Sequence, residues 1–192
     1  LARNFEAYTR EALALRDRNA ERIDLLVGFE TERLPPERWE ARMRELRTSA
    51  PFDYVIGSVH DVDGVCIDYS PELTRVAADA AGGVEALQVR YFDAVADLVA
   101  TLKPEVVGHI DLIRKFDGAG ASFSPRVFSH VERVLEAARS AGSVLDVNAA
   151  PARRGLGAVY PLPAILARAR EVGVGVTLGD DSHGPHDVGV GL

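Results

Sequence analysis

The stretch from Gly173 to His183 reads G-V-G-V-T-L-G-D-D-S-H. In its first half, Val and Leu alternate with Gly and Thr, which predicts a short strand buried in a parallel sheet. Gly179 ends the strand, and Asp181 and His183 follow directly. Because parallel α/β proteins place their chemistry at the carboxyl ends of strands, this pair predicts a metal site there. An acidic turn that contains a histidine is the alternative interpretation.

Four other predicted strands deliver polar residues in the same way. The strands at 23–29, 51–60, 105–111 and 143–147 carry, at or just past their ends, Glu30, His60, His109 with Asp111, and Asn148. Helices are predicted between them at 2–20, 35–46, 72–80, 84–102, 125–141 and 161–172. This alternation predicts an α/β fold with parallel strands joined by right-handed crossovers. A barrel is favoured over an open sheet, because only a barrel gathers all the strand ends around one mouth.

Composition limits the protein's class. The chain has 192 residues and 47% hydrophobic residues, which suits one globular domain over 1–192. Its net charge of −7, with basic residues dispersed among acidic ones, argues against nucleic-acid and membrane partners. Cys66 is the single cysteine and no apolar run reaches the length of a membrane span, so we expect a cytoplasmic protein.

The polar strand ends have the composition of a metal site. Three imidazoles and two carboxylates form the candidate ligand set: Glu30, His60, His109, Asp181 and His183. Mixed nitrogen and oxygen ligands without sulfur suit zinc, iron or manganese. Two ions about 3.5–4 Å apart would bind a phosphoryl or carbonyl oxygen and activate water, which predicts hydrolysis. His130 lies inside a predicted helix, and we expect it to be a hydrogen-bonded structural residue.

Five motifs carry a family resemblance. The series G-F-E, Y-V-I-G-S-V-H, V-V-G-H-I-D-L-I-R-K-F, D-V-N and G-D-D-S-H resembles the PHP (polymerase and histidinol phosphatase) superfamily. The chain is most similar to its monofunctional histidinol-phosphatases, because R-K-F follows the third motif and N-x-x-x-x-R-R precedes Y-P. The resemblance implies a distorted (β/α)7 barrel with two or three divalent ions, hydrolysing the phosphate monoester L-histidinol phosphate in histidine biosynthesis. The five candidate ligands match the family's ligands, and Arg153 matches a basic position that holds the substrate phosphate.

Other polar residues near the same mouth are candidates for substrate contacts. The loop A-A-P-A-R-R-G-L-G places Arg153 and, as a weaker candidate, Arg154 after the fourth strand, and a guanidinium can bind two phosphate oxygens at once. Arg114 and Lys115 either add positive potential or are surface charges. Asp111 is a candidate to orient His109 or to accept from the substrate amine. Asn148 is a candidate to bind the substrate or to accept a hydrogen bond from the free nitrogen of a metal-binding imidazole.

One departure from the family pattern affects the expected activity. Family members begin with an H-x-H strand that completes the metal cluster, and this sequence contains no H-x-H. Because the chain starts at Leu1 with a predicted helix, we expect an amino-terminal part of the barrel to be missing. The isolated chain is then expected to bind metal weakly, to turn over slowly and to associate into homo-oligomers through its open sheet edges.

Two other functions stay open at the level of the sequence. A nuclease or phosphoesterase of the same superfamily would use the same ligands, although the acidic balance and the lack of a basic, aromatic strand-binding surface argue against it. A metal-binding domain without catalysis is the second alternative. In a chain that carries the missing amino-terminal segment, bound metal without hydrolysis would favour the non-enzyme. Cleavage of nucleotides or single-stranded DNA would favour the nuclease.

Overall fold

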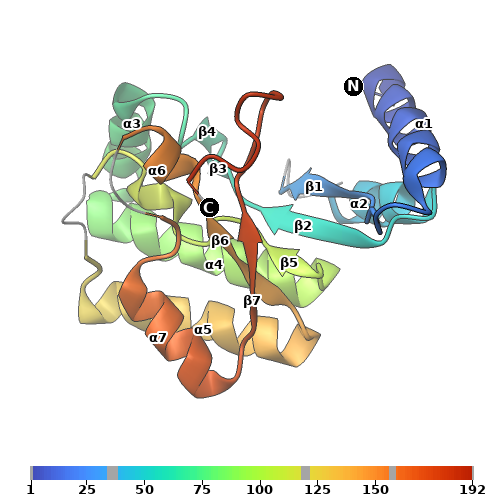
Figure 1. The fold of residues 1–192 in the computed structure, drawn as a ribbon. Coiled ribbons are helices and arrows are strands. Elements are labelled where there is room, and N and C mark those ends of the chain that lie inside the picture. Colours follow the sequence, from blue (N-terminus) through green and yellow to red (C-terminus); the bar gives the residue numbers. More distant parts are fainter. Residues whose placement is uncertain (1, 34–38, 118–121, 156–158, 192) are drawn as a thin grey trace.

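The architecture is a parallel sheet with helices, as seen in a computed structural model that describes residues 2–33, 39–117, 122–155 and 159–191. Five strands form the sheet: β1 (Gly28–Glu32), β2 (Tyr54–Ser58), β5 (Val106–Val107), β6 (Val144–Asn148) and β7 (Val176–Gly179). They pair in parallel in the order β1-β2-β5-β6-β7 (Figure 1). This confirms the predicted α/β class. Within the described ranges the sheet is not closed into a barrel, and β1 and β7 form its two edges.

The helices begin and end largely where the sequence predicts. They are α1 (Ala2–Asn19), α2 (Trp39–Thr48), α3 (Pro71–Ala81), α4 (Val84–Leu102), α5 (Pro125–Ala141), α6 (Ala150–Arg153) and α7 (Pro163–Val172). Ser124 caps α5 by accepting from the amide of Val127 at 3.3 Å, and Gly142 ends the helix in the left-handed conformation. Pro35 and Pro36, predicted to open α2, lie outside the described residues. None of the described helices is both long and apolar enough to span a lipid bilayer.

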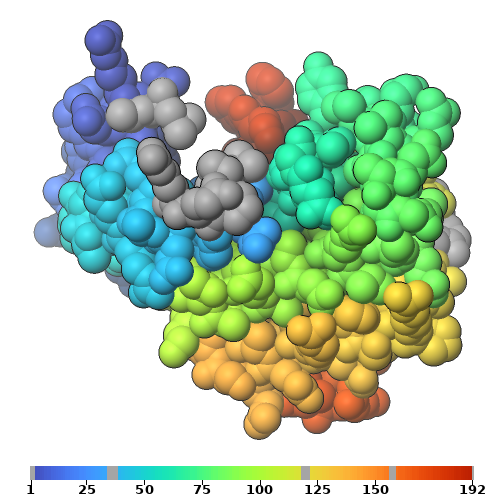
Figure 2. Space-filling view, turned by 180° about the vertical axis from the view of Figure 1, so that it is seen from behind, coloured from blue at the N-terminus to red at the C-terminus, as the bar shows by residue number. Residues whose placement is uncertain are grey.

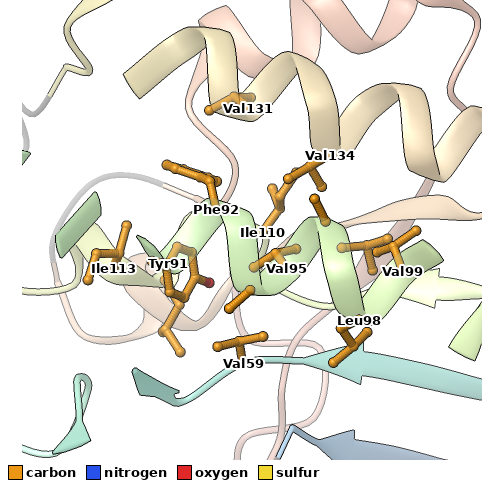
Figure 3. Close-up of a cluster of buried hydrophobic side chains, with 14 of the residues drawn as sticks. Val59, Tyr91, Phe92, Val95, Leu98, Val99, Ile110, Ile113, Val131 and Val134 are labelled. Atoms are coloured by element: carbon orange, nitrogen blue, oxygen red, sulfur yellow. The ribbon is translucent and has the colours of Figure 1, made fainter. Parts of the chain in front are cut away.

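The hydrophobic core lies between the sheet and α4, with α5 packed on the far side of α4. Val131 and Val134 of α5 face Phe92 and Val95 of α4, and Val59 closes the core from the strand side (Figure 3). Val127, Val131, Val134 and Ala138 lie at helical spacing along α5 and are all buried, so this helix packs through one apolar stripe. From behind, α4 and α5 form a continuous surface, and the upper edge is notched between the amino-terminal region (blue) and the carboxyl-terminal segment (red) (Figure 2).

Close packing of β2 on α4 requires a glycine in the strand. A Cβ added to Gly57 would lie 2.5 Å from Cδ2 of Leu98 and 2.7 Å from Cγ of Pro104. Neither contact is sterically possible unless the Leu98 side chain and the Pro104 ring move. Gly57 therefore lets β2 approach α4 closely.

Three strand predictions need correction. Residues 174–178 were expected to form a buried strand, but β7 is an edge strand in which Val176 and Leu178 are 54% and 69% exposed. The first strand begins at Gly28 rather than at Ile23, because only 28–32 pair with β2. The segment 61–70, where the sequence pattern predicts neither a strand nor a helix, contains a hairpin of β3 (Asp61–Val62) and β4 (Val65–Cys66).

Candidate metal centre

Three of the five predicted ligands converge where neighbouring strands end. Glu30 lies in β1, while His60 and His109 follow β2 and β5. Each offers one ligand atom, and these atoms lie within 4.8 Å of one another. Oε1 of Glu30 is 3.2 Å from Nε2 of His109 and 3.7 Å from Nε2 of His60. Because β1, β2 and β5 are adjacent, their register alone brings these side chains together.

Charge interactions within this cluster keep the carboxylate ionised. Partial burial alone would raise the pKa of Glu30, but the hydrogen bond and charge of His109 and the charge of His60 outweigh it and lower the pKa to about 2. Burial alone would lower the pKa of His60, whereas its contact with Glu32 and the charge of Glu30 raise it. A cation entering the cluster would therefore compete with a proton for His60 and would find Glu30 already ionised.

Glu32 is a part of the site that the sequence prediction missed. Its Oε1 accepts from the backbone amide of His60 at 3.1 Å, and its Oε2 is hydrogen-bonded to Nδ1 of the same ring. This leaves Nε2 of His60 directed toward Glu30, which is how outer carboxylates orient metal-binding imidazoles. Glu32 is two residues after Glu30 on one strand, so the period of two was the signal that could have found it.

The donor set fits a divalent cation. One carboxylate and two imidazoles suit zinc, iron or manganese. His109 is 5% exposed, and its Nδ1 is buried without a hydrogen-bond partner among the described residues. The unpaired Nδ1 is not the nitrogen that faces Glu30, because Nε2 of the same ring lies 3.2 Å from Oε1 of Glu30 and is the atom offered to the cluster. These three residues form the candidate metal centre.

The other two predicted ligands do not join the cluster. Asp181 and Glu30 both line an open hollow of about 880 Å³ on one face of the sheet. His183 is 73% exposed, and its Nδ1 is 3.8 Å from Oδ1 of Asp181. Among the described residues, the group within 4.8 Å consists of Glu30, His60 and His109. The assignment of Asp181 and His183 as ligands stays a prediction.

Asp146 lines the hollow, interacts with the charges of both His109 and Asp181, and was also missed by the sequence prediction. Its side chain lies on the face of β6 that lines the hollow and is 7% exposed. One carboxylate oxygen accepts a hydrogen bond from Nδ2 of Asn148 at 2.8 Å. Burial raises its pKa, opposed by Asn148 and by the charge of His109, while the charge of Asp181 adds to the increase. The D-V-N motif contained the signal, because Asp146 must share a face with Asn148.

Gly179 makes room for this carboxylate. A Cβ at Gly179 would lie 2.2 Å from Oδ1 of Asp146, so no larger residue fits without displacing the acid. Gly179, which ends β7, therefore leaves the space that the Asp146 carboxylate occupies. Asn148, predicted as a second-shell or substrate-binding residue, contacts Asp146 and also accepts from the amide of Ala150 at 2.9 Å.

The predicted phosphate-binding residues differ in position. Arg153 donates to the carbonyl oxygens of Asp180 and Asp181, and its side chain is 14% exposed. Arg154 is exposed at the end of α6. Lys115 donates to the carbonyl of Asp68 at 2.6 Å and to its carboxylate at 3.0 Å.

Asp111 and Arg114 form a buried pair instead of facing the hollow. Nε of Arg114 donates to Oδ2 of Asp111 at 2.6 Å. The side chain of Arg114 is 4% exposed and that of Asp111 is 0% exposed. The same carboxylate oxygen accepts from the amide of Leu162 at 2.8 Å, and the guanidinium lies 4.6 Å from the ring centre of Tyr160. Asp111 forms no hydrogen bond with His109 among the described contacts. The pair holds the segment 159–162 in place through hydrogen bonds to Val159 and Leu162. Both charged side chains are buried rather than on the surface.

Comparison with known proteins places the chain in a family. The chain is 38% identical over 195 residues to a probable histidinol-phosphatase of Schizosaccharomyces pombe, covering 99% of this chain and 63% of that protein. It is 30% identical over 182 residues to a probable histidinol-phosphatase of Deinococcus radiodurans, covering 95% of this chain and 66% of that protein. The chain thus spans about two thirds of the length of these relatives.

Solved structures show the same fold. A Listeria monocytogenes protein assigned as a histidinol phosphatase superposes with a TM-score of 0.85 at 26% identity, over 98% of this chain and 74% of that one. A histidinol phosphate phosphatase of Lactococcus lactis, complexed with zinc, L-histidinol and phosphate, superposes with a TM-score of 0.69 at 23% identity, over 93% of this chain and 66% of that one. The PHP domain family matches residues 3–150. The chain belongs to the PHP domain family.

Proposed function

We propose that this chain carries the catalytic centre of a metal-dependent phosphatase that hydrolyses L-histidinol phosphate to L-histidinol and phosphate. The convergence of Glu30, His60 and His109 carries the proposal, because an ionised carboxylate and two imidazoles at strand ends suit a hydrolytic metal. The substrate is suggested by relatives named as histidinol-phosphatases and by the histidinol and phosphate in the Lactococcus complex.

The residues suit two or three divalent cations, whether zinc, iron or manganese. Glu30, His60 and His109 would hold one, and Asp181 with His183 would contribute to a further site across the hollow. When bound, such ions neutralise the phosphoryl oxygens and lower the pKa of a water molecule, which then supplies the attacking oxygen. Hydrolysis of the monoester would join a water oxygen to phosphorus and break the ester P–O bond, and the leaving histidinol oxygen would take up a proton released by that water.

The chain's own side chains would orient the reacting groups. Glu32 holds the ring of His60 so that Nε2 faces the centre. Asp146 lies beside His109 and Asp181, so a carboxylate is available at the mouth to meet the cationic amine of histidinol. The earlier candidate for that amine, Asp111, has no exposed surface, and its catalytic role stays a prediction.

The same acidic hollow favours a small monoester over a nucleic acid. Glu30, Asp146 and Asp181 line it, and carboxylates repel a phosphodiester backbone unless cations intervene. Cytoplasmic location and homo-oligomer formation stay predictions.

Phosphate release measured alongside metal content tests this function. Protein loaded with zinc or manganese is expected to release phosphate from L-histidinol phosphate, and His109→Ala is expected to lose both bound metal and activity. His130→Ala is the matched control, because His130 contacts Asp93 on the helical side of the molecule at 2.7 Å. Bound metal without phosphate release would contradict the phosphatase, and preferential cleavage of single-stranded DNA would favour the nuclease.

A further inference from the structure

Asp187 lies in the loop that follows β7 and contacts two residues predicted to act at the site. Its Oδ2 accepts a hydrogen bond from the backbone amide of His183 at 3.2 Å. Its Oδ1 lies 3.6 Å from Nε of Arg153, which ends α6 beside this loop (Figure 1). The side chain of Asp187 is 29% exposed and that of Arg153 is 14% exposed. One carboxylate thus connects a predicted metal ligand with a predicted phosphate-binding residue.

The contacts of Arg153 leave part of its guanidinium available to an anion. Nη1 donates to the carbonyl of Asp180, and Nη2 donates to the carbonyl of Asp181 at 2.9 Å. A guanidinium has five N–H groups, two on each Nη and one on Nε. Among the described contacts, each Nη therefore uses one N–H and keeps a second, and such a pair can bind two phosphate oxygens. Because Asp187 lies on the Nε side, it can orient the guanidinium without occupying that pair.

The ring of His183 depends on its backbone for its position. Its side chain is 73% exposed, and its Nδ1 lies 2.9 Å from the carbonyl oxygen of Asp181. Asp181 itself has a φ of 52°, in the left-handed region, which costs free energy for a residue with a Cβ. The amide of Asp187 donates to the carbonyl of Gly184 at 3.0 Å, and this turn returns the Asp187 carboxylate to the His183 amide. That carboxylate therefore holds the backbone from which the His183 ring projects.

We propose that Asp187 is a positioning residue, which holds the His183 backbone through one carboxylate oxygen and directs the Arg153 guanidinium through the other. The inference rests on the proposed function, in which His183 helps to hold a cation, and on the prediction that Arg153 binds the substrate phosphate. Aspartate suits this position because an ionised carboxylate offers two acceptor oxygens and a negative charge. Since one side chain contacts both residues, it sets the position of the phosphate-binding group relative to the cation.

Amide hydrogen exchange in Asp187→Ala tests the backbone contact without any substrate. The amide of His183 is expected to exchange about tenfold faster or more, the factor for losing a hydrogen bond to a charged acceptor. The amide of Gly189 is an internal control, because it donates to Oδ2 of Asp180 at 2.6 Å and should keep its exchange rate. Unchanged exchange at His183 would overturn the proposal. Equally faster exchange at both amides would overturn it too, because the loop would then have unfolded as a whole.

Two substitutions at Asp187 separate its two contacts. Asparagine keeps an acceptor for the His183 amide but lacks the charge that attracts Arg153. In Asp187→Asn we therefore expect weaker inhibition by inorganic phosphate and a raised KM, each by about two- to fivefold, the factor for a partly exposed ion pair. Metal affinity and kcat should change little in this variant. Unchanged phosphate inhibition in Asp187→Asn would contradict the role toward Arg153.

Alanine removes both contacts of Asp187. Compared with Asp187→Asn, we expect Asp187→Ala to show in addition a roughly tenfold weaker affinity for zinc or manganese and a lower kcat, because His183 is no longer held. A metal affinity equal to that of the unmodified chain would contradict the role toward His183. Glu132→Ala is the matched control, because it removes a carboxylate whose Oε1 lies 3.0 Å from Nε of Arg168, between α5 and α7. It should leave exchange, metal affinity and phosphate inhibition unchanged.

The two variants also keep the test decisive when one part of it fails. If Asp187→Ala does not fold, the phosphate inhibition of Asp187→Asn still decides the role toward Arg153. Failure of the proposed function gives a different result. A chain that releases no phosphate from L-histidinol phosphate would still show, in Asp187→Ala, faster exchange at His183 than at Gly189, and weaker binding of inorganic phosphate in Asp187→Asn.

Discussion

The two halves of the predicted ligand set are built differently. On the β1–β2–β5 side, Glu30, His60 and His109 come from adjacent strands and lie within 4.8 Å of one another. On the β6–β7 side, Asp181 and His183 lie in a loop beyond an edge strand, and His183 is 73% exposed. The first half is assembled by strand register, whereas the second depends on hydrogen bonds to backbone carbonyls. Rigid elements place ligands more precisely than loops do, so we expect the first half to dominate metal affinity.

The largest expected effect is a loss of folding stability when the Asp111–Arg114 contact, which joins the two halves, is removed. Asp111 follows β5 and pairs with Arg114, and both bind the segment 159–162 that follows β6 and α6. Asp111→Ala would leave the guanidinium buried without its partner, which typically destabilises a protein by about 3–5 kcal/mol. Chemical denaturation without metal should show this loss. Normal stability combined with a lost kcat would instead support the catalytic role predicted for Asp111.

A smaller but still large effect is expected for Glu30→Gln. The substitution removes the one carboxylate of the three-residue cluster, and we expect zinc or manganese affinity to fall roughly a hundredfold or more, beyond the loss typical of an outer-shell residue. Titration calorimetry measures this directly. Glu136→Gln, at an exposed site of α5, serves as the control. If affinity survives in Glu30→Gln but is lost in His183→Ala, the proposed ranking of the halves is reversed.

Glu32→Gln sharpens the comparison within the first half. The amide can still contact His60, but it lacks the charge that orients the ring and favours Nε2 as the ligand. We expect metal affinity to fall about 10–100-fold, as for other residues that hold a metal-binding histidine. Competition with a chelator provides the measurement. An unchanged affinity would show that strand register alone orients His60.

The smallest effect is expected for Gly179→Ala in the second half. Its Cβ would meet Oδ1 of Asp146 at 2.2 Å and would push that side chain toward the hollow, at a cost of about 1 kcal/mol, the lower end for overpacking. Gly175→Ala is the matched control on the approach to β7, because its Cβ would lie 3.2 Å from a Val144 methyl group. Thermal denaturation of both variants makes the comparison. Equal thermal stabilities of Gly179→Ala and Gly175→Ala would show that the Asp146 side chain moves aside without a cost in free energy.

The predictions that the structure confirms rest on local patterns, whereas those it corrects depend on contacts between distant parts of the chain. Period-two and helical patterns are local, so the parallel α/β class and helices such as α5 were predictable from the chain. The exposure of β7 was not predictable, because it depends on which strand has a neighbour on only one side. Glu32 and Asp146 could have been found by applying the period of two to the residues already selected.

The sequence by itself determined the types of donor and the strand ends that deliver them, because both follow from residue identity and local periodicity. Only the tertiary structure decided which donors meet. Glu30 and His109 are 79 positions apart and come within 3.2 Å through the pairing of three strands. Likewise, only packing turned Asp111 and Arg114 toward each other and Arg153 toward the loop carbonyls. Contacts between distant positions depend on register and packing, which no local pattern contains.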